Sequence, residues 1–320
     1  MKRMGVLFIG VLIWLAVKAP AQELGIMGGI LNKPDYARSY AWKINYYDVI
    51  SDNYLWSFSW YNEGHITDNH RDGMLLQAWY RMPVAPDKFY IGLGAGPFYF
   101  FDTTGNDIAY KNIHGFALAL GLDLWYYLSP RWALKGNITY IVADNANTNT
   151  QSALAGISYK FKDLNDSRGP YINYADSNEV NLFLGKTILN SFHTHTNYAA
   201  MAEYRRNVGK YMDLSAALLY EGDTSVLRRN GVIIQAWPTK RFDGGRFSLG
   251  VGLGAYVTIN RRELDVDDIS PSSDIAGIVT MTGAYRFSGT PLTLRASWNR
   301  IVTTYDKDTD VIMAGLGVYF

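Results

Sequence analysis

The sequence predicts an all-β protein of the transmembrane antiparallel β-barrel class, for three reasons. Apolar residues alternate with small or polar ones at a period of two, as from Phe247 to Val257. These alternating segments are about 10 residues long, which is the length of a tilted membrane-spanning strand. No run of about 18 apolar residues follows residue 22, so a membrane-embedded mature chain would have to cross the bilayer with strands.

The composition agrees with a membrane barrel and excludes several other classes. Charged residues make up 18% of the chain and hydrophobic residues 48%, whereas charged residues are about 25% of a typical soluble domain. The absence of Cys excludes a disulfide scaffold, a thiolate metal site and a Cys nucleophile. The formal net charge is only +1, so the chain lacks the basic excess that would attract a nucleic-acid partner.

The first residues have the pattern of an export signal. Lys2 and Arg3 precede an apolar run from Val6 to Val17, and Ala19-Pro20-Ala21 has the small residues of a cleavage site. We therefore expect a signal peptide over 1–21 and a mature chain that begins at Gln22. The alternative is an N-terminal membrane anchor, for which the apolar run is short.

The mature sequence contains an internal duplication. A shift of 158 positions, as from Ile30 to Ile188, aligns many identical residues almost without gaps. The identities include Glu63-Gly64 with Glu221-Gly222, Gln77-Ala78-Trp79 with Gln235-Ala236-Trp237, and Gly92, Gly94 and Gly96 with Gly250, Gly252 and Gly254. We therefore expect two repeats, 22–162 and 180–320, joined by a periplasmic connection over 163–179.

Each repeat is predicted to contain eight strands. In the first repeat they are expected near 23–31, 39–47, 54–62, 73–82, 88–101, 115–128, 132–141 and 151–161. The connections between them alternate between short turns and longer polar loops, as periplasmic turns and outer loops do in an outer-membrane barrel. The even strand number places both ends of the mature chain in the periplasm.

The C-terminus resembles that of Gram-negative outer-membrane β-barrel proteins. Phe320 follows Gly317-Val318-Tyr319, which is similar to the C-terminal aromatic signal of that class. The resemblance implies an integral, multi-pass protein of the outer membrane, surrounded by lipids that include lipopolysaccharide. It also implies recognition by the barrel-assembly machinery through Phe320. A soluble periplasmic β-protein would have alternating strands too, and is the alternative.

The sixteen strands can close as one barrel or as two tandem eight-stranded barrels, and we favour one. Sixteen strands enclose an aqueous channel, whereas eight leave an interior only just wide enough for side chains. The inward positions carry more basic than acidic residues, and a hydrated lumen accommodates such charges at little cost. The Gly-rich face of the strand at 88–101 and the long connection instead suit two narrow barrels. The predicted lumen-lining residues are Lys43, Asn45, Gln77, Arg81, Asp123, Lys135, Glu203, Arg205, Gln235, Arg286 and Arg295.

The sharpest repeated motif is a Glu-Gly pair followed by an Arg. It occurs as Glu63-Gly64 with Arg71 and again as Glu221-Gly222 with Arg229. We expect the carboxylate and the guanidinium to stand at opposite ends of an outer loop and to pair across the hairpin. A ligand site is the alternative interpretation.

No known catalytic pattern is found. Each repeat is weakly similar in shape to the lipid A deacylases, which are eight-stranded barrels with a His and a Ser two apart near the outer end of the seventh strand. The corresponding positions here hold Trp298 and Arg300, or Ile138 and Tyr140. A Ser nucleophile needs a base within reach, so the resemblance does not carry the activity over, and no catalytic residues are predicted.

Metal binding is not predicted either, and no cofactor is expected. All five His residues fall in predicted outer loops, and His193 and His195 have a spacing that two metal ligands on one strand face would share. Asp306, Asp308 and Asp310 begin like a calcium loop but lack its Gly and its Glu. Solvated loops explain both groups more simply.

Three functions remain open at this point. The preferred one is an outer-membrane channel for polar solutes, with a saccharide or exopolysaccharide as the candidate cargo. The second is an outer-membrane barrel that modifies or binds lipid A. The third is a closed structural or surface-binding barrel.

Overall fold

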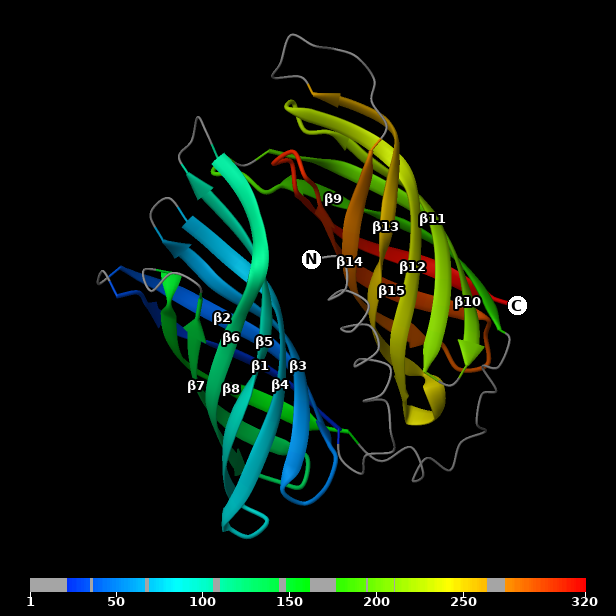
Figure 1. Cartoon of the computed structure of the whole chain (residues 1–320). Coiled ribbons are helices and arrows are strands. Elements are labelled where there is room, and N and C mark those ends of the chain that lie inside the picture. The colour runs from blue at the N-terminus through cyan, green and yellow to red at the C-terminus, as the bar shows by residue number, and fades with distance from the viewer. Residues whose placement is uncertain are drawn as a thin grey trace. The chain divides into compact units, whose positions relative to one another are not determined.

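The computed structural model describes residues 22–34, 37–66, 69–105, 110–143, 148–161, 177–193, 195–209, 211–263 and 274–320. The chain forms two compact units, one containing β1 to β8 and the other β9 to β16 (Figure 1). The predicted signal peptide and most of the predicted connection over 163–179 lie outside the described residues. Among the described residues, no helix is long and apolar enough to cross a membrane.

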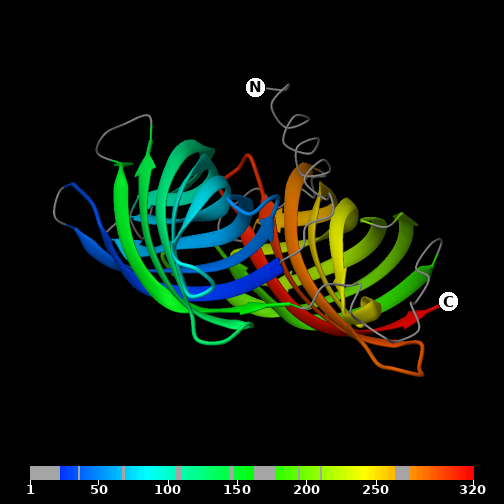
Figure 2. The same ribbon diagram turned by 90° about the horizontal axis from the view of Figure 1, so that it is seen from below.

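The first unit is a closed antiparallel barrel in which the strands follow one another in chain order. Its strands are β1 Gln22–Asn32, β2 Arg38–Val49, β3 Tyr54–Ile66, β4 Asn69–Ala85, β5 Phe89–Gly105, β6 Tyr110–Tyr127, β7 Trp132–Val142 and β8 Thr150–Lys160. Closure comes from β1 and β8, which pair from Glu23 with Lys160 to Asn32 with Gln151 (Figure 2).

The second unit repeats this order. Its strands are β9 Asn178–Leu189, β10 Thr196–Gly209, β11 Met212–Asp223, β12 Leu227–Phe242, β13 Phe247–Glu263, β14 Ile275–Arg286, β15 Leu292–Val302 and β16 Thr309–Tyr319, with one 3₁₀ turn, η3 Asp243–Gly245. Here β16 closes the ring on β9, from Thr309 with Leu189 to Tyr319 with Glu179.

The predicted fold class, an all-β antiparallel barrel protein with sixteen strands, is confirmed, but the closure into one sixteen-stranded ring is corrected. The described strands form two closed eight-stranded barrels, which was the alternative. The physical reason is that β8 pairs with β1 over the whole length of both strands. No free edge is then left in the first barrel for a strand of the second repeat to join.

Each barrel has an apolar outer wall and a filled lumen. On β15, Leu292 and Leu294 are exposed, whereas Thr293 and Arg295, which alternate with them, are buried. The period of two therefore separates the two faces as predicted. Large apolar residues point outward on most strands of both barrels, as they do on a barrel that faces lipid.

An apolar layer crosses each lumen between polar clusters nearer its two ends. In the first barrel it consists of Met27, Leu31, Ala41, Tyr61, Leu75, Phe98, Ala117, Ala119, Ile141 and Leu154. In the second it consists of Phe183, Ala199, Met201, Ala217, Leu219, Ile233, Tyr256, Ala276, Ile278, Ile301, Val311 and Met313. The interior of an eight-stranded barrel is just wide enough for such a filling.

The repeated glycines of β5 and β13 make room for a tryptophan inside each lumen. A Cβ on Gly252 would lie 2.7 Å from the Trp237 ring, and one on Gly94 would clash with the Trp79 ring. The indole Nε1–H of Trp79 donates to Ser57 Oγ, and that of Trp237 to Ser215 Oγ, at 2.8 Å in both cases. In each barrel the Trp of the Gln-Ala-Trp motif thus packs against the Gly-x-Gly-x-Gly motif.

Several predicted outer loops are strands instead. The β3–β4 ladder reaches Ile66 opposite Asn69, and the β5–β6 ladder reaches Gly105 opposite Tyr110. His65, His70 and His114 consequently lie on strands, where the rings of His65 and His70 stack 4.3 Å apart between centroids. Polar composition predicted loops here, but strands that extend past the apolar band also have polar residues.

Candidate functional site

The Glu-Gly motif of the first repeat is a β-bulge. The β3–β4 register shifts between Asn62 and His65, so Glu63 and Gly64 are accommodated outside the regular ladder. Gly64 has a φ of +66°, and a Cβ there would clash with the backbone oxygen of Tyr40. Only glycine fits such a position without strain, and the bulge directs the Glu63 side chain into the lumen.

Glu63 and Arg71 form a buried ion pair in the first lumen. The pair lies near the end of the barrel at which β3 is joined to β4, which we call the loop end. The hydroxyl of Thr150 on β8 joins them: it accepts a hydrogen bond from Arg71 Nη2 at 3.1 Å and donates to Glu63 Oε1. Three strands, β3, β4 and β8, are therefore tied together across the lumen. The sequence predicted this pairing across the hairpin, but not the third partner.

The second repeat builds the same cluster from Glu221, Arg229 and Thr309. Arg229 Nε and Nη2 donate to the two Glu221 oxygens at 2.6 and 2.9 Å, a bidentate arrangement. Thr309 Oγ1 lies 2.7 Å from both Arg229 Nη2 and Glu221 Oε2. Gly222 has a φ of +75°, so the bulge is repeated too, and Arg229 also donates to Tyr305 Oη at 2.8 Å.

The opposite end of the first lumen, at which β4 is joined to β5 and which we call the turn end, has a cluster centred on Lys135. Its ammonium lies 3.4 Å from Asp123 Oδ2 and 3.7 Å from Glu23 Oε1. The same ammonium sits over the Trp125 ring, 3.7 Å from the centroid, and 4.0 Å from that of Tyr47. The Tyr47 hydroxyl donates to Asp123. A buried cation is thus neutralised by two carboxylates and two aromatic faces.

Lys43 and Asn45 belong to a polar layer that lies between that cluster and the apolar layer. Lys43 Nζ donates to Asn137 Oδ1 and Thr139 Oγ1, both at 3.0 Å, and Asn137 in turn donates to Asp123. Asn45 Nδ2 lies 3.3 Å from the Tyr47 hydroxyl. This network of side chains joins β2, β6 and β7 inside the lumen.

The two repeated glutamines differ in their partners. Gln235 Nε2 donates to Thr280 Oγ1 at 2.9 Å. The Gln77 amide is buried, and none of its polar atoms has a hydrogen-bond partner among the described residues. A buried unpaired amide costs free energy unless water reaches it.

Arg81 and Arg286 lie at the turn ends of the two lumens, where they are half-buried. The Arg81 guanidinium stacks over the Tyr90 ring at 4.6 Å from the centroid, and that of Arg286 over Tyr319 at 4.5 Å. Both are therefore held by aromatic faces.

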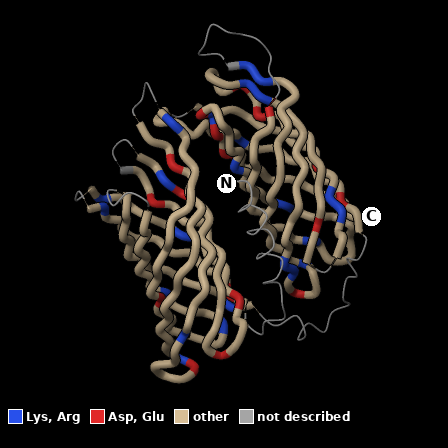
Figure 3. The backbone as a smooth tube through the Cα atoms, in the orientation of Figure 1, with Lys and Arg blue, Asp and Glu red and all other residues tan. Residues whose placement is uncertain are grey.

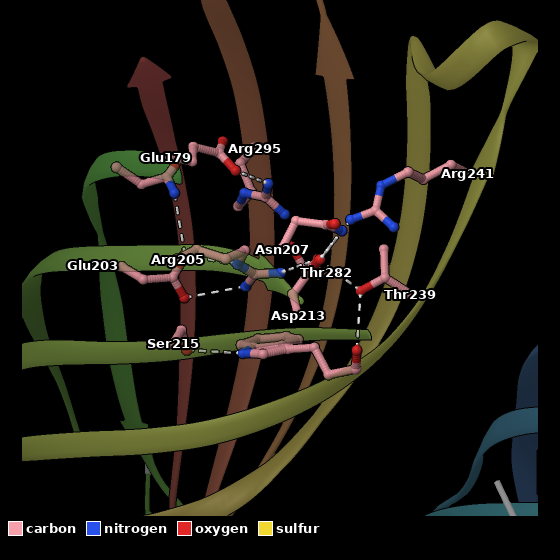
Figure 4. Close-up of polar contacts among 12 residues, drawn as sticks. Glu179, Glu203, Arg205, Asn207, Asp213, Ser215, Thr239, Arg241, Thr282 and Arg295 are labelled. Carbon is pink, nitrogen blue, oxygen red and sulfur yellow. Dashed lines mark hydrogen bonds and ion pairs between the residues drawn. The ribbon is translucent and has the colours of Figure 1, made fainter. Parts of the chain in front are cut away.

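The turn-end cluster of the second barrel is built from arginines (Figure 4). Arg205 binds both oxygens of Glu203 at 3.1 Å, and its guanidinium lies 3.8 Å from the centroid of the Trp237 ring. Asp213 Oδ2 is 3.9 Å from Arg205 Nη1, and Asn207 Nδ2 donates to Asp213 Oδ1 at 2.8 Å. Stacking on an aromatic ring and bidentate pairing are both typical of Arg.

Two further arginines complete this cluster. Arg295 Nη2 lies 2.6 Å from Glu179 Oε2, and Arg241 Nη2 lies 2.5 Å from Asp213 Oδ1 (Figure 4). Arg205, Arg295 and Arg241 therefore each have a carboxylate partner among the described residues.

The sequence reasoning missed acidic residues that balance the lumen charge. Glu23 and Glu179, near the start of β1 and β9, are buried and face the lumen beside Lys135 and Arg295. The sequence could have revealed Glu23, because it lies an even number of residues from the inward-facing Met27 on the same strand and therefore points to the same face. With these carboxylates included, the basic excess that favoured a hydrated channel is much reduced.

The combination of a polar, filled lumen with an apolar outer wall decides the architecture. The fold is that of an outer-membrane β-barrel. Protein-family models and curated proteins were compared with the chain, and neither gave a match.

Solved structures of outer-membrane β-barrels are similar to the chain. The N-terminal β-barrel domain of Pseudomonas aeruginosa OprF is 15% identical, with 45% of this chain and 98% of that chain covered and a TM-score of 0.38. Neisserial surface protein A is 14% identical over 45% and 98% of the two chains, with a TM-score of 0.38. The NanC porin is 8% identical over 92% and 98%, with a TM-score of 0.22. These structures do not test the likeness to lipid A deacylases, which stays a prediction.

Proposed function

We propose that the protein is an integral outer-membrane protein that acts as a closed, surface-binding pair of barrels. One observation carries this proposal: each lumen is filled by an apolar layer and by ion pairs. Lys135, Arg205, Arg295, Arg71 and Arg229 all have carboxylate partners among the described residues.

The membrane location is supported by the outer walls. Leu182 and Leu184 on β9 are 66% and 75% exposed, and Leu93 on β5 is 57% exposed. A soluble protein rarely leaves so many large apolar side chains in water, whereas a barrel in lipid requires them. Phe320, the residue by which we expect the barrel-assembly machinery to recognise the chain, is 69% exposed.

A closed lumen argues against a wide solute pathway. Water and ions cannot cross the layer that contains Phe98, Leu75 and Leu154 without displacing packed side chains. A saccharide or exopolysaccharide needs still more room, which eight strands do not enclose. The sites that contact other molecules are then expected on the outer wall and the loop ends.

A narrow passage for water or small ions is the second candidate. It is favoured by buried polar atoms that have no partner among the described residues, such as the Gln77 amide, Asn45 Oδ1 and Thr187 Oγ1. Such groups are usually satisfied by ordered water. Water that enters each end of a lumen would still meet the apolar layer.

Lipid modification is the least supported function. Trp298 and Arg300, which occupy the place of the deacylase residues, lie on the outward face of β15 and bind Asp310 at 2.7 and 2.6 Å. None of these side chains supplies a nucleophile with a base. Mass spectrometry of lipid A with and without the protein tests this function directly.

Conductance in planar bilayers separates the closed barrel from the channel. We expect no current steps from the full-length protein. The variant Leu75→Ala/Phe98→Ala, which removes two side chains from the apolar layer, should conduct, whereas the outward control Leu93→Ala should not. Heat-resistant migration on gels checks that each variant is folded. Regular current steps from the wild-type protein would overturn the closed-lumen proposal.

A further inference from the structure

The outer wall of the second barrel has an apolar groove that crosses six strands. Its volume is about 1080 Å³, slightly above the range of roughly 300–1,000 Å³ that is usual for small-molecule pockets. The outward-facing residues that line it are Leu182 and Leu184 on β9, Ala200 and Ala202 on β10, Leu218 and Tyr220 on β11, Asn230 on β12, Ile259 on β13, and Ala314, Leu316 and Val318 on β16.

The register explains how the groove forms. Residues that pair across neighbouring strands make two adjacent rows over the wall, one from Ala314 through Leu184, Ala200, Tyr220 and Asn230 to Asn260, the other from Leu316 through Leu182, Ala202 and Leu218 to Val232. The alanines form the floor because their side chains are short. The leucines on both sides form the walls.

The groove descends across the wall. At β13 it reaches Ile259, close to the strand end that leads into a loop, whereas at β16 it reaches Val318, close to the opposite end of the barrel. Five strand-to-strand steps of roughly 4.8 Å make it about 24 Å long. Such a path leads from the level of the lipid headgroups into the hydrocarbon layer, which is about 30 Å thick.

Two exposed arginines stand at the upper end of the groove. Arg228 and Arg262 are direct partners on β12 and β13, and each lies two residues beyond Asn230 or Asn260 on the same face. Figure 3 shows basic residues at this end of the two strands. Like charges directly opposite each other destabilise a sheet. Among the described residues neither guanidinium has a hydrogen bond or an ion pair.

The nearest carboxylates among the described residues have other partners. Asp223, which is opposite Arg228 on β11, accepts a hydrogen bond from the Ser225 backbone N–H. Asp274 forms an ion pair with Arg261 on the other face of β13. Lys186, exposed on β9 one row above Leu184, adds a third cation beside the groove.

We propose that this wall binds one phosphorylated acyl lipid of the outer leaflet, an inference that rests on the proposed membrane location. The headgroup phosphate lies between Arg228 and Arg262, where it forms charge-assisted hydrogen bonds with both guanidinium groups. An acyl chain follows the groove over Ala200 and Ala202. Lys186 reaches a second anionic group of the same headgroup, since its long stem lets the ammonium rise to the interface.

The first barrel provides an internal comparison. The positions that align with Ala200 and Ala202 hold Trp42 and Ile44, so large side chains replace the groove floor. In the row of Arg228 and Arg262 the first barrel has His70 opposite Thr103. The lipid site is therefore assigned to the second barrel alone.

Lipid binding to the purified full-length protein tests the proposal. The probe is lipopolysaccharide added to protein in phosphatidylcholine nanodiscs, with its dephosphorylated form and inorganic phosphate as two further arms. We expect phosphate-dependent binding of lipopolysaccharide and no binding of inorganic phosphate alone. Arg228→Gln/Arg262→Gln should weaken binding by about tenfold or more, because two charge-assisted contacts are lost.

Variants in the groove test the acyl chain separately. Ala202→Trp fills the floor and should weaken binding, whereas Ala216→Trp, on the same outer wall but outside the groove, should not. Arg38→Gln in the first barrel is the matched charge control. Equal binding by the double Arg variant and the wild type, or by the dephosphorylated lipid, would refute the site. A wild-type dimer that Ala202→Trp separates would show that a second copy occupies the groove instead.

The failure of this site and the failure of the proposed function have different readouts. Insertion into nanodiscs that lack lipopolysaccharide depends only on the apolar wall. Protein that does not insert there contradicts the membrane location. Protein that inserts normally but shows no phosphate-dependent binding contradicts the lipid site alone.

Discussion

The two barrels of this chain share their loop-end clusters and differ in their turn-end clusters. Glu63, Arg71 and Thr150 in the first barrel correspond to Glu221, Arg229 and Thr309 in the second, with the same bulge and the same three strands. At the other end, Lys135 between aromatic rings in the first barrel contrasts with the arginine cluster around Arg205 in the second.

The comparison separates a feature that both repeats keep, the loop-end cluster, from one that varies between them, the turn-end cluster. The Glu–Arg–Thr cluster joins the third and fourth strands of each barrel to the last strand, so it cross-links the barrel through its lumen. The turn-end clusters only need to neutralise charge inside a filled lumen, and several combinations of residues do that. The outer walls also differ, because the groove over Ala200 and Ala202 belongs to the second barrel.

The largest change that we expect the two barrels to tolerate is separation of the repeats into two chains. Residues 22–162 expressed alone should fold into a heat-resistant barrel, because β8 closes on β1 without any residue of the second repeat. Residues 177–320, which keep all of β9 and the Glu179 partner of Arg295, should behave in the same way. The measurement is gel migration with and without heating after refolding in detergent. If neither half folds while the full chain does, the two barrels are not independent units.

Breaking one loop-end ion pair should have the next largest effect. Arg229→Met leaves the Glu221 carboxylate buried without its partner, which should lower the free energy of unfolding by about 3–5 kcal/mol. Arg71→Met should do the same in the first barrel, since its pair is equally buried. Equilibrium urea unfolding in lipid vesicles measures both. The control Glu221→Gln/Arg229→Met removes both charges and should recover part of the loss.

Replacing the bulge glycines should have the smallest of the three effects. Gly64→Ala and Gly222→Ala place a Cβ on a residue with positive φ, at a cost of about 1–2 kcal/mol before any clash. The matched control is Gly28→Ala, where the nearest atom to a new Cβ would be 3.9 Å away. Similar unfolding midpoints for Gly64→Ala and Gly28→Ala would show that the bulge is not needed to place Glu63.

Much of the lumen was predictable because a strand alternates its side chains strictly. The sequence placed Lys43, Gln77, Asp123, Arg205 and Arg295 on inward faces, and the structure has all of them inside a barrel. It did not reveal Thr150 or Thr309 as partners of the Glu–Arg pairs, because these contacts join residues about 80 to 90 positions apart. Such pairs depend on which strands become neighbours across the lumen.

The sequence by itself predicted the strand class, a duplication and the inward and outward faces, since these follow from local periodicity and identity. Only the tertiary structure decided which strand closes on which. The last strand of the first repeat has the same alternation whether it pairs with β1 or with β9, so its pattern does not distinguish the two closures. Its partner is set by strand tilt, register and the space that side chains such as Trp79 and Phe98 need inside the ring.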